Sequence, residues 1–487
     1  MLMSENTLLL TSGESSRNIG GLSLAFTVIC ILDVFGVFPI ITLSKAVIDC
    51  GININKRFYG ILIILAVCSA QIYTAILLGK CWIIAEKIYP TLYRRNRYPY
   101  SALAEITYGR CLSNCVIFLL DLTIFGGGIP NLIVASRNLQ LLNLRINDNN
   151  TDISYCYWII ILGLILCPVL WLGSPKDMKC VCTLSVLIVV AVFLLTSGSL
   201  LFTNKIDSNL KEANDGHVPL WKSILTAYGI IAFQFDIHPT ILTIQIDMHN
   251  KFKLPIAIIG AFIVSLCMFG IVAALTCFKY GKGAHPSILE TMPPTIILDV
   301  VAGLTALQLC LTSAVSNNAL YQHMEDCLGI SREFNSKRCI LRTILTLLSI
   351  IIAESVPKFD LVMSIIGGTL TGPLVFVLPP LFYLKMLSIN AKYEKQLKMQ
   401  TFNNDDNHLK IQTTIRDCRF NYGICNGWKY TFRAYFEKGL CGLIIIVGAA
   451  ATILTTYLNI SNFILSYSDF TNTKPCIYNI SATLLYL

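Results

Sequence analysis

Long apolar stretches alternate with short charged segments along most of the chain. Each stretch holds roughly 17 to 28 residues, which is enough for a helix that crosses the hydrocarbon core of a bilayer with some tilt. The pattern predicts an all-α polytopic membrane protein with about eleven transmembrane helices in a domain at 21–458. The predicted helices are 21–48, 59–81, 113–135, 156–172, 180–202, 221–243, 255–278, 295–317, 340–356, 361–384 and 438–458.

Polar segments and charge set the predicted orientation. A tail at 1–20, a long loop at 385–437 and a tail at 459–487 flank or interrupt the helices. With the N-terminus in the cytosol, the inner segments hold roughly twice as many Lys and Arg as the outer ones, as the positive-inside rule requires. This places the loop in the cytosol and the C-terminal tail outside or in a lumen. Asn149, Asn459 and Asn479 begin N-x-S/T patterns on the outer side, so we expect glycosylation there.

Composition narrows the class further. The chain is 55% hydrophobic and 13% charged, with a mean hydropathy of +0.65, whereas a soluble domain carries about 25% charged residues. The net charge of +9 resides in short loops, so membrane lipid and not nucleic acid is the expected environment. Most of the 19 cysteines lie in apolar runs and form no zinc-type pair; a disulfide among Cys50, Cys156 and Cys476 stays open.

Two of the predicted helices carry polar groups and a proline near their middle. The sixth contains Asp236, His238 and Pro239, and the first contains Asp33, Gly36 and Pro39. Proline removes a backbone donor and interrupts a helix, and an intramembrane carboxylate or imidazole marks a functional site. Five helices separate the two breaks, which is the arrangement of a transporter with two inverted five-helix repeats. Two ordinary proline kinks are the alternative.

Three stretches resemble one family in the correct order. Tyr228 to Met248 (YGIIAFQFDIHPTILTIQIDM) resembles the sixth-helix signature of the amino acid/auxin permease family. Leu172 to Asp177 (LGSPKD) and Val356 to Pro373, followed by Leu378-Pro379-Pro380, are similar to further parts of its invertebrate members and of its vesicular inhibitory amino acid transporter branch. The resemblance implies a leucine-transporter-like 5+5 inverted repeat with helices 1 and 6 broken. It also implies symport or antiport of amino acids or related amines, coupled to protons or sodium.

The substrate site is expected at the two breaks. Freed N–H groups at a helix end attract an anion, and freed carbonyls attract a cation. The substrate carboxylate is therefore assigned to backbone beside Gly36, over Phe38, Pro39, Ile40 and Ile41, and its amine to carbonyls from Ala232 to Phe235. The aromatic residues Tyr228, Phe233 and Phe235 are expected to wall the pocket.

Candidate coupling groups lie nearby in the sequence. Asp236, His238 and Asp33 are candidates for proton coupling, because an imidazole titrates near neutrality and burial raises a carboxylate toward that range. A mutually satisfied structural pair of Asp236 and His238 is the alternative. The fold resemblance places sodium-coordinating oxygens at Thr312, Ser313 and Asn317.

Other functions follow from a departure in the first helix. Only Gly36 precedes Pro39, where family members usually carry several glycines. A non-transporting amino acid sensor on the same fold is therefore an alternative to the transporter, and a channel is a further one. No compact catalytic constellation points to an enzyme, and no cofactor or protein partner is indicated beyond the coupling ion. The membrane is the plasma membrane or an endolysosomal or vesicular one.

Overall fold

The computed structural model describes residues 21–50, 59–90, 98–146, 154–171, 178–202, 219–330, 334–356, 359–403 and 427–468. Nearly all of them are helical, which confirms an all-α fold. Within these described ranges, seven helices are long and apolar enough to cross a membrane. They are α5 (Tyr59–Ile88), α8 (Arg110–Ile146), α10 (Met178–Phe202), α13 (Leu254–Tyr280), α15 (Ile296–Cys327), α18 (Leu378–Asn403, together with the segment before it) and α20 (Gly427–Ser468).

The remaining predicted spans are present as shorter or interrupted helices. The first is α2 (Leu24–Phe35), α3 (Phe38–Ile41) and α4 (Leu43–Asp49) in succession, and the sixth is α11 (Leu220–Gln234) followed by α12 (His238–Asp247). The fourth and ninth are α9 (Tyr155–Trp171) and α16 (Ser336–Ser355). The interruptions of the first and sixth helices are therefore confirmed, whereas the inverted repeat stays a prediction. Short helices α7 (Pro99–Tyr108), α14 (Ile288–Thr291), η2 (Lys251–Lys253) and η3 (Gly281–Gly283) connect the longer ones.

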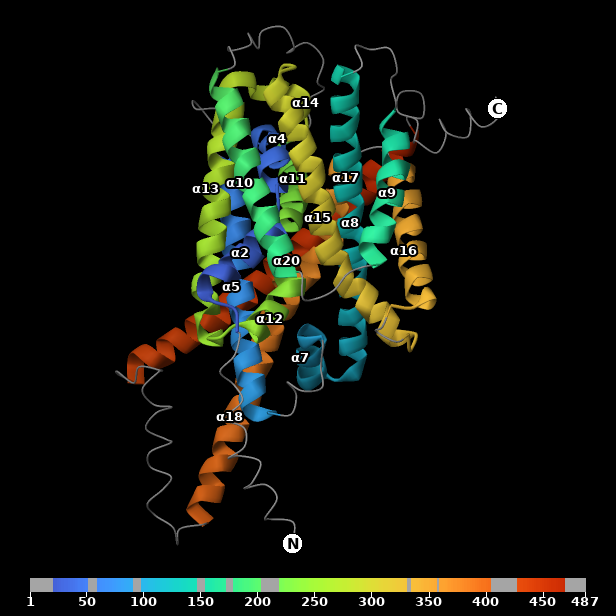
Figure 1. Ribbon diagram of the computed structural model, residues 1–487. Coiled ribbons are helices and arrows are strands. Elements are labelled where there is room, and N and C mark those ends of the chain that lie inside the picture. Colours follow the sequence, from blue (N-terminus) through green and yellow to red (C-terminus); the bar gives the residue numbers. More distant parts are fainter. Residues whose placement is uncertain are drawn as a thin grey trace.

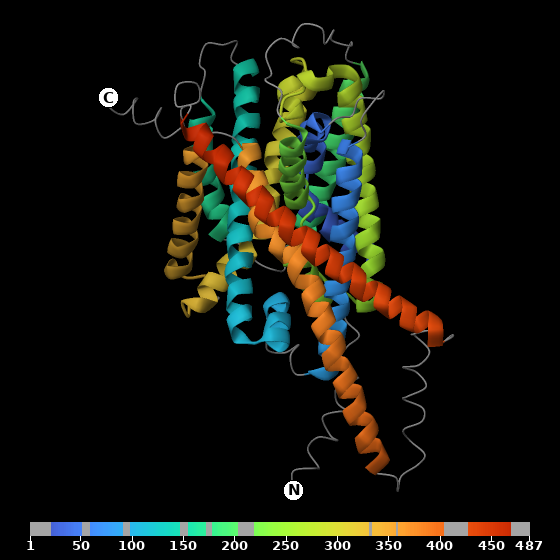
Figure 2. The ribbon, with the colours of Figure 1, turned by 180° about the vertical axis from the view of Figure 1, so that it is seen from behind.

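The helices form two groups joined through α15. In Figure 1, α2, α10 and α13 lie on the left and α8, α9 and α16 on the right, with α15 between them. Figure 2 shows α20 crossing the rear of the bundle obliquely, over α18. Only 17% of the most apolar window of α20 is buried, so this helix presents an apolar face to its surroundings.

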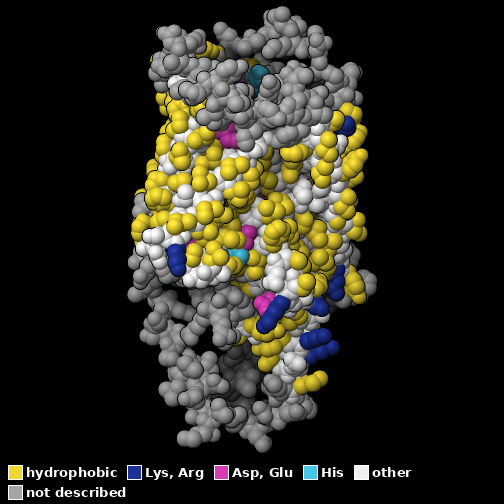
Figure 3. Space-filling model, turned by 90° about the vertical axis from the view of Figure 1, so that its right-hand side faces the viewer, with side chains coloured by type: hydrophobic (Ala, Val, Ile, Leu, Met, Phe, Trp, Pro, Cys, Tyr) yellow, Lys and Arg dark blue, Asp and Glu magenta, His cyan; other side chains and the backbone are white. Residues whose placement is uncertain are grey.

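The surface agrees with a membrane environment. Figure 3 shows a broad hydrophobic band around the described part of the molecule, with most of the Lys and Arg on this face below it. Large apolar side chains such as Phe118, Leu187 and Ile446 are exposed on the described part of the molecule. Lipid would cover such side chains, so the chain is a multi-pass integral membrane protein.

Several helices extend beyond the predicted membrane spans. The eighth helix continues to Cys327 instead of 317, and the tenth to Asn403 instead of 384. The eleventh spans Gly427–Ser468 instead of 438–458, so parts of the predicted loop and of the C-terminal tail are helical. Hydropathy marks only the part of a helix that contacts lipid, whereas backbone hydrogen bonding continues into the polar surroundings. The tail at 1–20 lies outside the described residues.

One segment of the tenth span has an unusual backbone. After α17 (Phe359–Ile365) come two π-helical stretches, η4 (Ile366–Thr371) and η5 (Pro373–Val377). Here the chain approaches α11 closely, because a Cβ added at Gly367 would lie 1.8 Å from the Gly229 carbonyl oxygen. Wide helical turns of this kind are frequent at functional sites. This contact holds the half of the sixth helix that precedes its break.

Candidate functional site

The first helix is broken at a glycine. Gly36 follows α2 with φ 59° and ψ −152°, a backbone conformation that is essentially restricted to glycine. Pro39 then occupies the first turn of α3, where its missing N–H breaks no helical hydrogen bond. Glycine and proline therefore produce the interruption that the sequence predicted, and Gly36 is the residue at which the direction of the chain changes.

The second break lies between Gln234 and His238. The Phe235 amide still donates to the Ile231 carbonyl at 3.2 Å, after which the helix stops. Asp236 stabilises the start of α12, because its Oδ1 accepts the backbone N–H of His238 at 3.0 Å. A short polar side chain that satisfies a free N–H at a helix start stabilises that start. Asp236 thus has a capping role in addition to any functional one.

An aromatic pair joins the two breaks. The rings of Phe38 and Phe233 lie edge to face with centroids 6.3 Å apart. Gly127 of α8 faces Phe233, whose Cε2 would lie 3.7 Å from an added Cβ. Gly126 faces Ile366 in the same way, and Gly128 faces Asn317. We call the surroundings of Phe38, Phe233, Gly127, Ile366 and Asn317 the central region; it is largely apolar, and both breaks border it.

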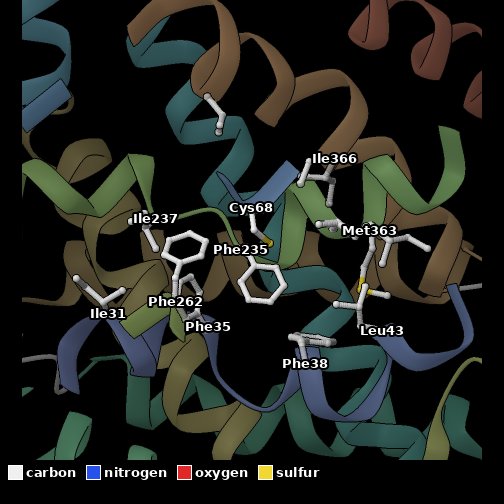
Figure 4. Close-up of a cluster of buried hydrophobic side chains, with 14 of the residues drawn as sticks. Ile31, Phe35, Phe38, Leu43, Cys68, Phe235, Ile237, Phe262, Met363 and Ile366 are labelled. Atoms are coloured by element: carbon white, nitrogen blue, oxygen red, sulfur yellow. The ribbon is translucent and has the colours of Figure 1, made fainter. Parts of the chain in front are cut away.

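Two of the predicted pocket residues point elsewhere. Phe235 is fully buried and packs against Phe35 and Phe262, with ring centroids 5.3 and 5.8 Å away (Figure 4). It therefore fills the space between the first, sixth and seventh helices instead of walling the pocket. The Tyr228 ring lies 5.8 Å from that of Phe376, toward the tenth span. Phe233 is the aromatic residue of the sixth helix that faces the central region.

The backbone amides of the first break are mostly occupied. Those of Ile40 and Ile41 both donate to the Val37 carbonyl, at 3.0 and 3.1 Å. The Val37 amide instead donates to Oε1 of Gln308 on α15, at 3.4 Å. In this conformation the amide that points out of the helix is therefore Val37, and not those of Ile40 and Ile41 as the sequence suggested.

A buried glutamine contacts each of the two breaks. Gln308 lies against Gly36, because a Cβ there would be 2.9 Å from its Nε2. Gln71 of α5 donates to the Ala232 carbonyl at 3.0 Å, next to the second break. Neither glutamine was predicted as a site residue from the sequence, although an amide within an apolar helix is itself a signal of a buried polar function.

Asp236, His238 and Thr74 form a buried polar chain. The His238 ring is fully buried, with Nδ1 3.3 Å from Asp236 Oδ1 and Nε2 3.0 Å from Thr74 Oγ1. The first pair is at ion-pair distance but is not aligned as a hydrogen bond. Thr74 Oγ1 also lies 3.0 Å from the Ala70 carbonyl and 3.2 Å from that of Gln71. The Thr74 hydroxyl has a single hydrogen for these alternatives.

The polar chain of Asp236, His238 and Thr74 has two protonation states that agree with the observed distances. If Thr74 donates to His238 Nε2, the ring is neutral and carries its hydrogen on Nδ1, toward Asp236. If Thr74 donates to a carbonyl, Nε2 must donate to Thr74, and a hydrogen on Nδ1 then makes the ring a cation beside the Asp236 carboxylate. The two states differ by one proton and one hydroxyl rotation. The geometry therefore brings the Asp236 carboxylate and the His238 ring to within 3.3 Å of each other in a buried position.

Asp33 lies one turn before the first break, separate from this chain. Its carboxylate is buried, and the side chains of Ser185 and Cys182 on α10 are its hydrogen-bond neighbours. Its Oδ1 has no hydrogen-bond partner among the described residues. Asp33 thus contacts the fifth helix, whereas Asp236 and His238 contact the second.

The outer-side expectations are only partly met. Asn459 is 1% exposed inside α20, where its amide donates to the Ser364 carbonyl and its oxygen accepts from the Ser364 hydroxyl. Glycosylation of Asn459 is therefore a wrong prediction; Asn149 and Asn479 lie outside the described residues. Cys156, near the start of α9, is disulfide-bonded, whereas Cys50 is a free, buried thiol.

Residues 23–404 match the family described as transmembrane amino acid transporter protein. Amino acid transporter AVT1J of Arabidopsis thaliana is 24% identical over 345 residues, which cover 69% of this chain and 77% of that protein. AVT1E of the same plant is 24% identical over 367 residues, covering 71% of this chain and 67% of that protein. Sodium-coupled neutral amino acid symporter 2 of Danio rerio is 26% identical over 170 residues, 33% of each chain.

Among solved structures, a manganese transporter of Eremococcus coleocola is 13% identical with a TM-score of 0.46, covering 92% of this chain and 98% of that one. MhsT in complex with L-phenylalanine is 14% identical with a TM-score of 0.42, covering 76% of this chain and 96% of that one. The related proteins are transporters and not enzymes. The family match covers most of the chain, which therefore belongs to the transmembrane amino acid transporter protein family.

Proposed function

We propose that this protein is a secondary active transporter that moves amino acids across its membrane by alternating access. The observation that carries this proposal is the pair of helix breaks, at Gly36 and at Phe235 to Ile237, joined by the contact of Phe38 with Phe233. Broken helices offer free backbone groups to a zwitterion at membrane depth, where few other polar partners exist. Membership of the family supports an amino acid as the substrate.

The substrate we propose is a neutral amino acid. Its carboxylate would approach the backbone of the first break beside Gly36 and Phe38, and its amine the carbonyls from Ala232 to Phe235. Its side chain would meet Phe38, Phe233 and Ile366 in the central region, which offers apolar contacts and no charged partner among these residues. The name of the Danio rerio relative, a symporter of neutral amino acids, supports this substrate class.

Asp236 and His238 are the proposed proton-coupling groups, with Asp33 as a second candidate. Their two protonation states differ in the direction of the Thr74 hydroxyl, so proton binding would alter the contact between α12 and α5. Tyr100 of α7 is a further titratable group near Asp236. A proton can drive transport only if it stabilises one conformation more than another. Sodium is the alternative coupling ion, as in the Danio rerio relative.

Asp236→Asn tests the coupling role. The change removes the charge at nearly constant volume, and we expect exchange of amino acids to persist while accumulation driven by a pH gradient is lost. Both are measured in proteoliposomes and normalised to folded protein. Asp49→Asn is the control, because Asp49 is a half-exposed carboxylate paired with Lys45 far from the break. Full pH-driven accumulation by Asp236→Asn would exclude Asp236 as the coupling group.

The proposed orientation places the N-terminus in the cytosol and the start of α9 on the outer or lumenal side. The disulfide of Cys156 supports this side, because disulfides persist in oxidising compartments. The membrane is the plasma membrane or an endolysosomal or vesicular one. In intact cells that carry the protein at their surface, a tag after Leu487 should be accessible to antibody without permeabilisation. A tag that becomes accessible only after permeabilisation would contradict this orientation.

A further inference from the structure

The eighth helix offers hydroxyl oxygens where the sequence analysis placed sodium. Thr312 and Ser313 are adjacent on α15, and both side chains are buried. A hard cation such as sodium binds oxygen ligands whose lone pairs face it. Whether these hydroxyls suit a cation therefore depends on what their oxygen atoms already face.

Both hydroxyl oxygens face amide nitrogens. Nε2 of Gln308 donates to Thr312 Oγ1 at 2.7 Å, and Nδ2 of Asn131 on α8 donates to Ser313 Oγ at 2.9 Å. Gln308 Nε2 also donates to Ser185 Oγ of α10 at 3.2 Å. The amide hydrogens thus point at the oxygen lone pairs that a bound cation would need. The Ser313 hydroxyl could equally donate to a flipped Asn131 amide, so the contact that decides is the one from Gln308.

The direction of the Gln308 amide is fixed by the first helix. Its oxygen accepts the Val37 N–H, a group that can only donate. A flipped amide would bring Nε2 against that N–H and leave two donors facing each other, so the flip is excluded on hydrogen-bonding grounds. Gly36 allows this approach, because a Cβ there would lie 2.9 Å from Nε2. The nitrogen is therefore held toward Ser185 and Thr312.

We infer that the carboxamide of Gln308 replaces sodium at this site, so that transport by this chain does not use sodium bound to Thr312 and Ser313. The inference rests on the proposed transport function and specifies its coupling. An N–H group carries the positive end of a dipole and makes the same contact to oxygen that a cation makes. A sodium ion entering here would be repelled by the Gln308 N–H₂ group and would have to break its buried hydrogen bonds to Ser185 and Thr312. The hydroxyls of Thr312 and Ser313 thus join α15 to α10 and α8 as structural acceptors.

Sodium binding to the purified protein tests this inference without any transport. Saturable binding of radioactive sodium and the thermal unfolding midpoint are measured in sodium chloride and in choline chloride of equal ionic strength. We expect the wild type to show no saturable binding and the same midpoint in both salts. Saturable sodium binding that is lost in Thr312→Val would overturn the inference. Failure of amino acid uptake would instead bear on the proposed function and leave this result unchanged.

Gln308→Glu provides the matched variant. It keeps the shape and the acceptor toward Val37 but replaces the N–H₂ donor with an oxygen, so that Ser185, Thr312 and the new carboxylate surround one position with oxygens. We expect this variant to gain a sodium-specific rise in its unfolding midpoint and saturable sodium binding. If Gln308→Glu folds and responds to sodium no more than the wild type does, the amide nitrogen is not the group that excludes the ion. The wild-type measurement remains decisive if the variant does not fold.

Discussion

Substitution of Gly36 by alanine should destabilise the protein through two separable effects. The backbone at Gly36 has φ 59° and ψ −152°, which only glycine adopts readily, and forcing another residue into this region costs about 1–3 kcal/mol. The new Cβ would also lie 2.9 Å from Gln308 Nε2. The Gln308 side chain can move away, but it then loses buried hydrogen bonds that contribute about 0.5–1.5 kcal/mol each.

The two effects together predict a loss of about 2 to 4 kcal/mol in the free energy of unfolding. Two control glycines separate them. Gly109 has φ 92° and ψ 180°, with no atom within 4 Å of an added Cβ, so Gly109→Ala tests backbone strain alone. Gly303 lies within α15 and also has no neighbour within 4 Å, so Gly303→Ala should have little effect or stabilise slightly.

Reversible denaturation in detergent, followed by intrinsic fluorescence, measures all three variants. We expect the order of stability to be Gly303→Ala, then Gly109→Ala, then Gly36→Ala as the least stable. The difference between the last two reports the contact with Gln308. If Gly36→Ala is no less stable than Gly109→Ala, then Gln308 does not contact the first break. Its amide is then not held in the orientation that would exclude sodium.

Three further predictions concern packing. Gly367→Ala should prevent correct folding, measured as loss of the monodisperse peak in size-exclusion chromatography, because its Cβ would lie 1.8 Å from a backbone oxygen. Arg342→Met should lower the free energy of unfolding by about 1–3 kcal/mol, because the buried Arg342 Nε donates to Glu325 at 2.6 Å and the change leaves Glu325 only its longer contact of 3.3 Å with Arg338 Nε. Phe235→Leu should lower the unfolding midpoint with unchanged affinity for amino acids, whereas Phe233→Leu should weaken amino acid affinity, measured by scintillation proximity binding.

Much of the fold could be predicted because membrane helices have strong local signals. Continuous apolar runs predicted the helices. Gly36 and Pro239 predicted the interruptions, because glycine adopts backbone conformations that other residues avoid and proline removes a backbone hydrogen-bond donor. The helix ends could not be predicted from hydropathy, since α18 and α20 continue as far as Asn403 and Ser468 through polar sequence that gives no apolar signal.

The partners at the site depend on how helices rotate and pack, which no local pattern contains. Phe233 and Phe235 are two residues apart in one aromatic run, yet one faces the central region and the other packs against Phe35 and Phe262. Gln308 contacts the first break through the Val37 amide, next to Gly36, although the two hydrogen-bonded residues are 271 positions apart in the sequence. Only the folded structure brings such distant residues together.

The central claim is that amino acids cross the membrane through the region between the two breaks. Counterflow in proteoliposomes tests it most directly: vesicles loaded with an unlabelled neutral amino acid are diluted into a trace of labelled amino acid. The account predicts saturable entry of label that rises above its equilibrium level and depends on the internal amino acid. Saturable binding of label without entry would indicate a sensor, entry without saturation would indicate a channel, and either result would contradict the account.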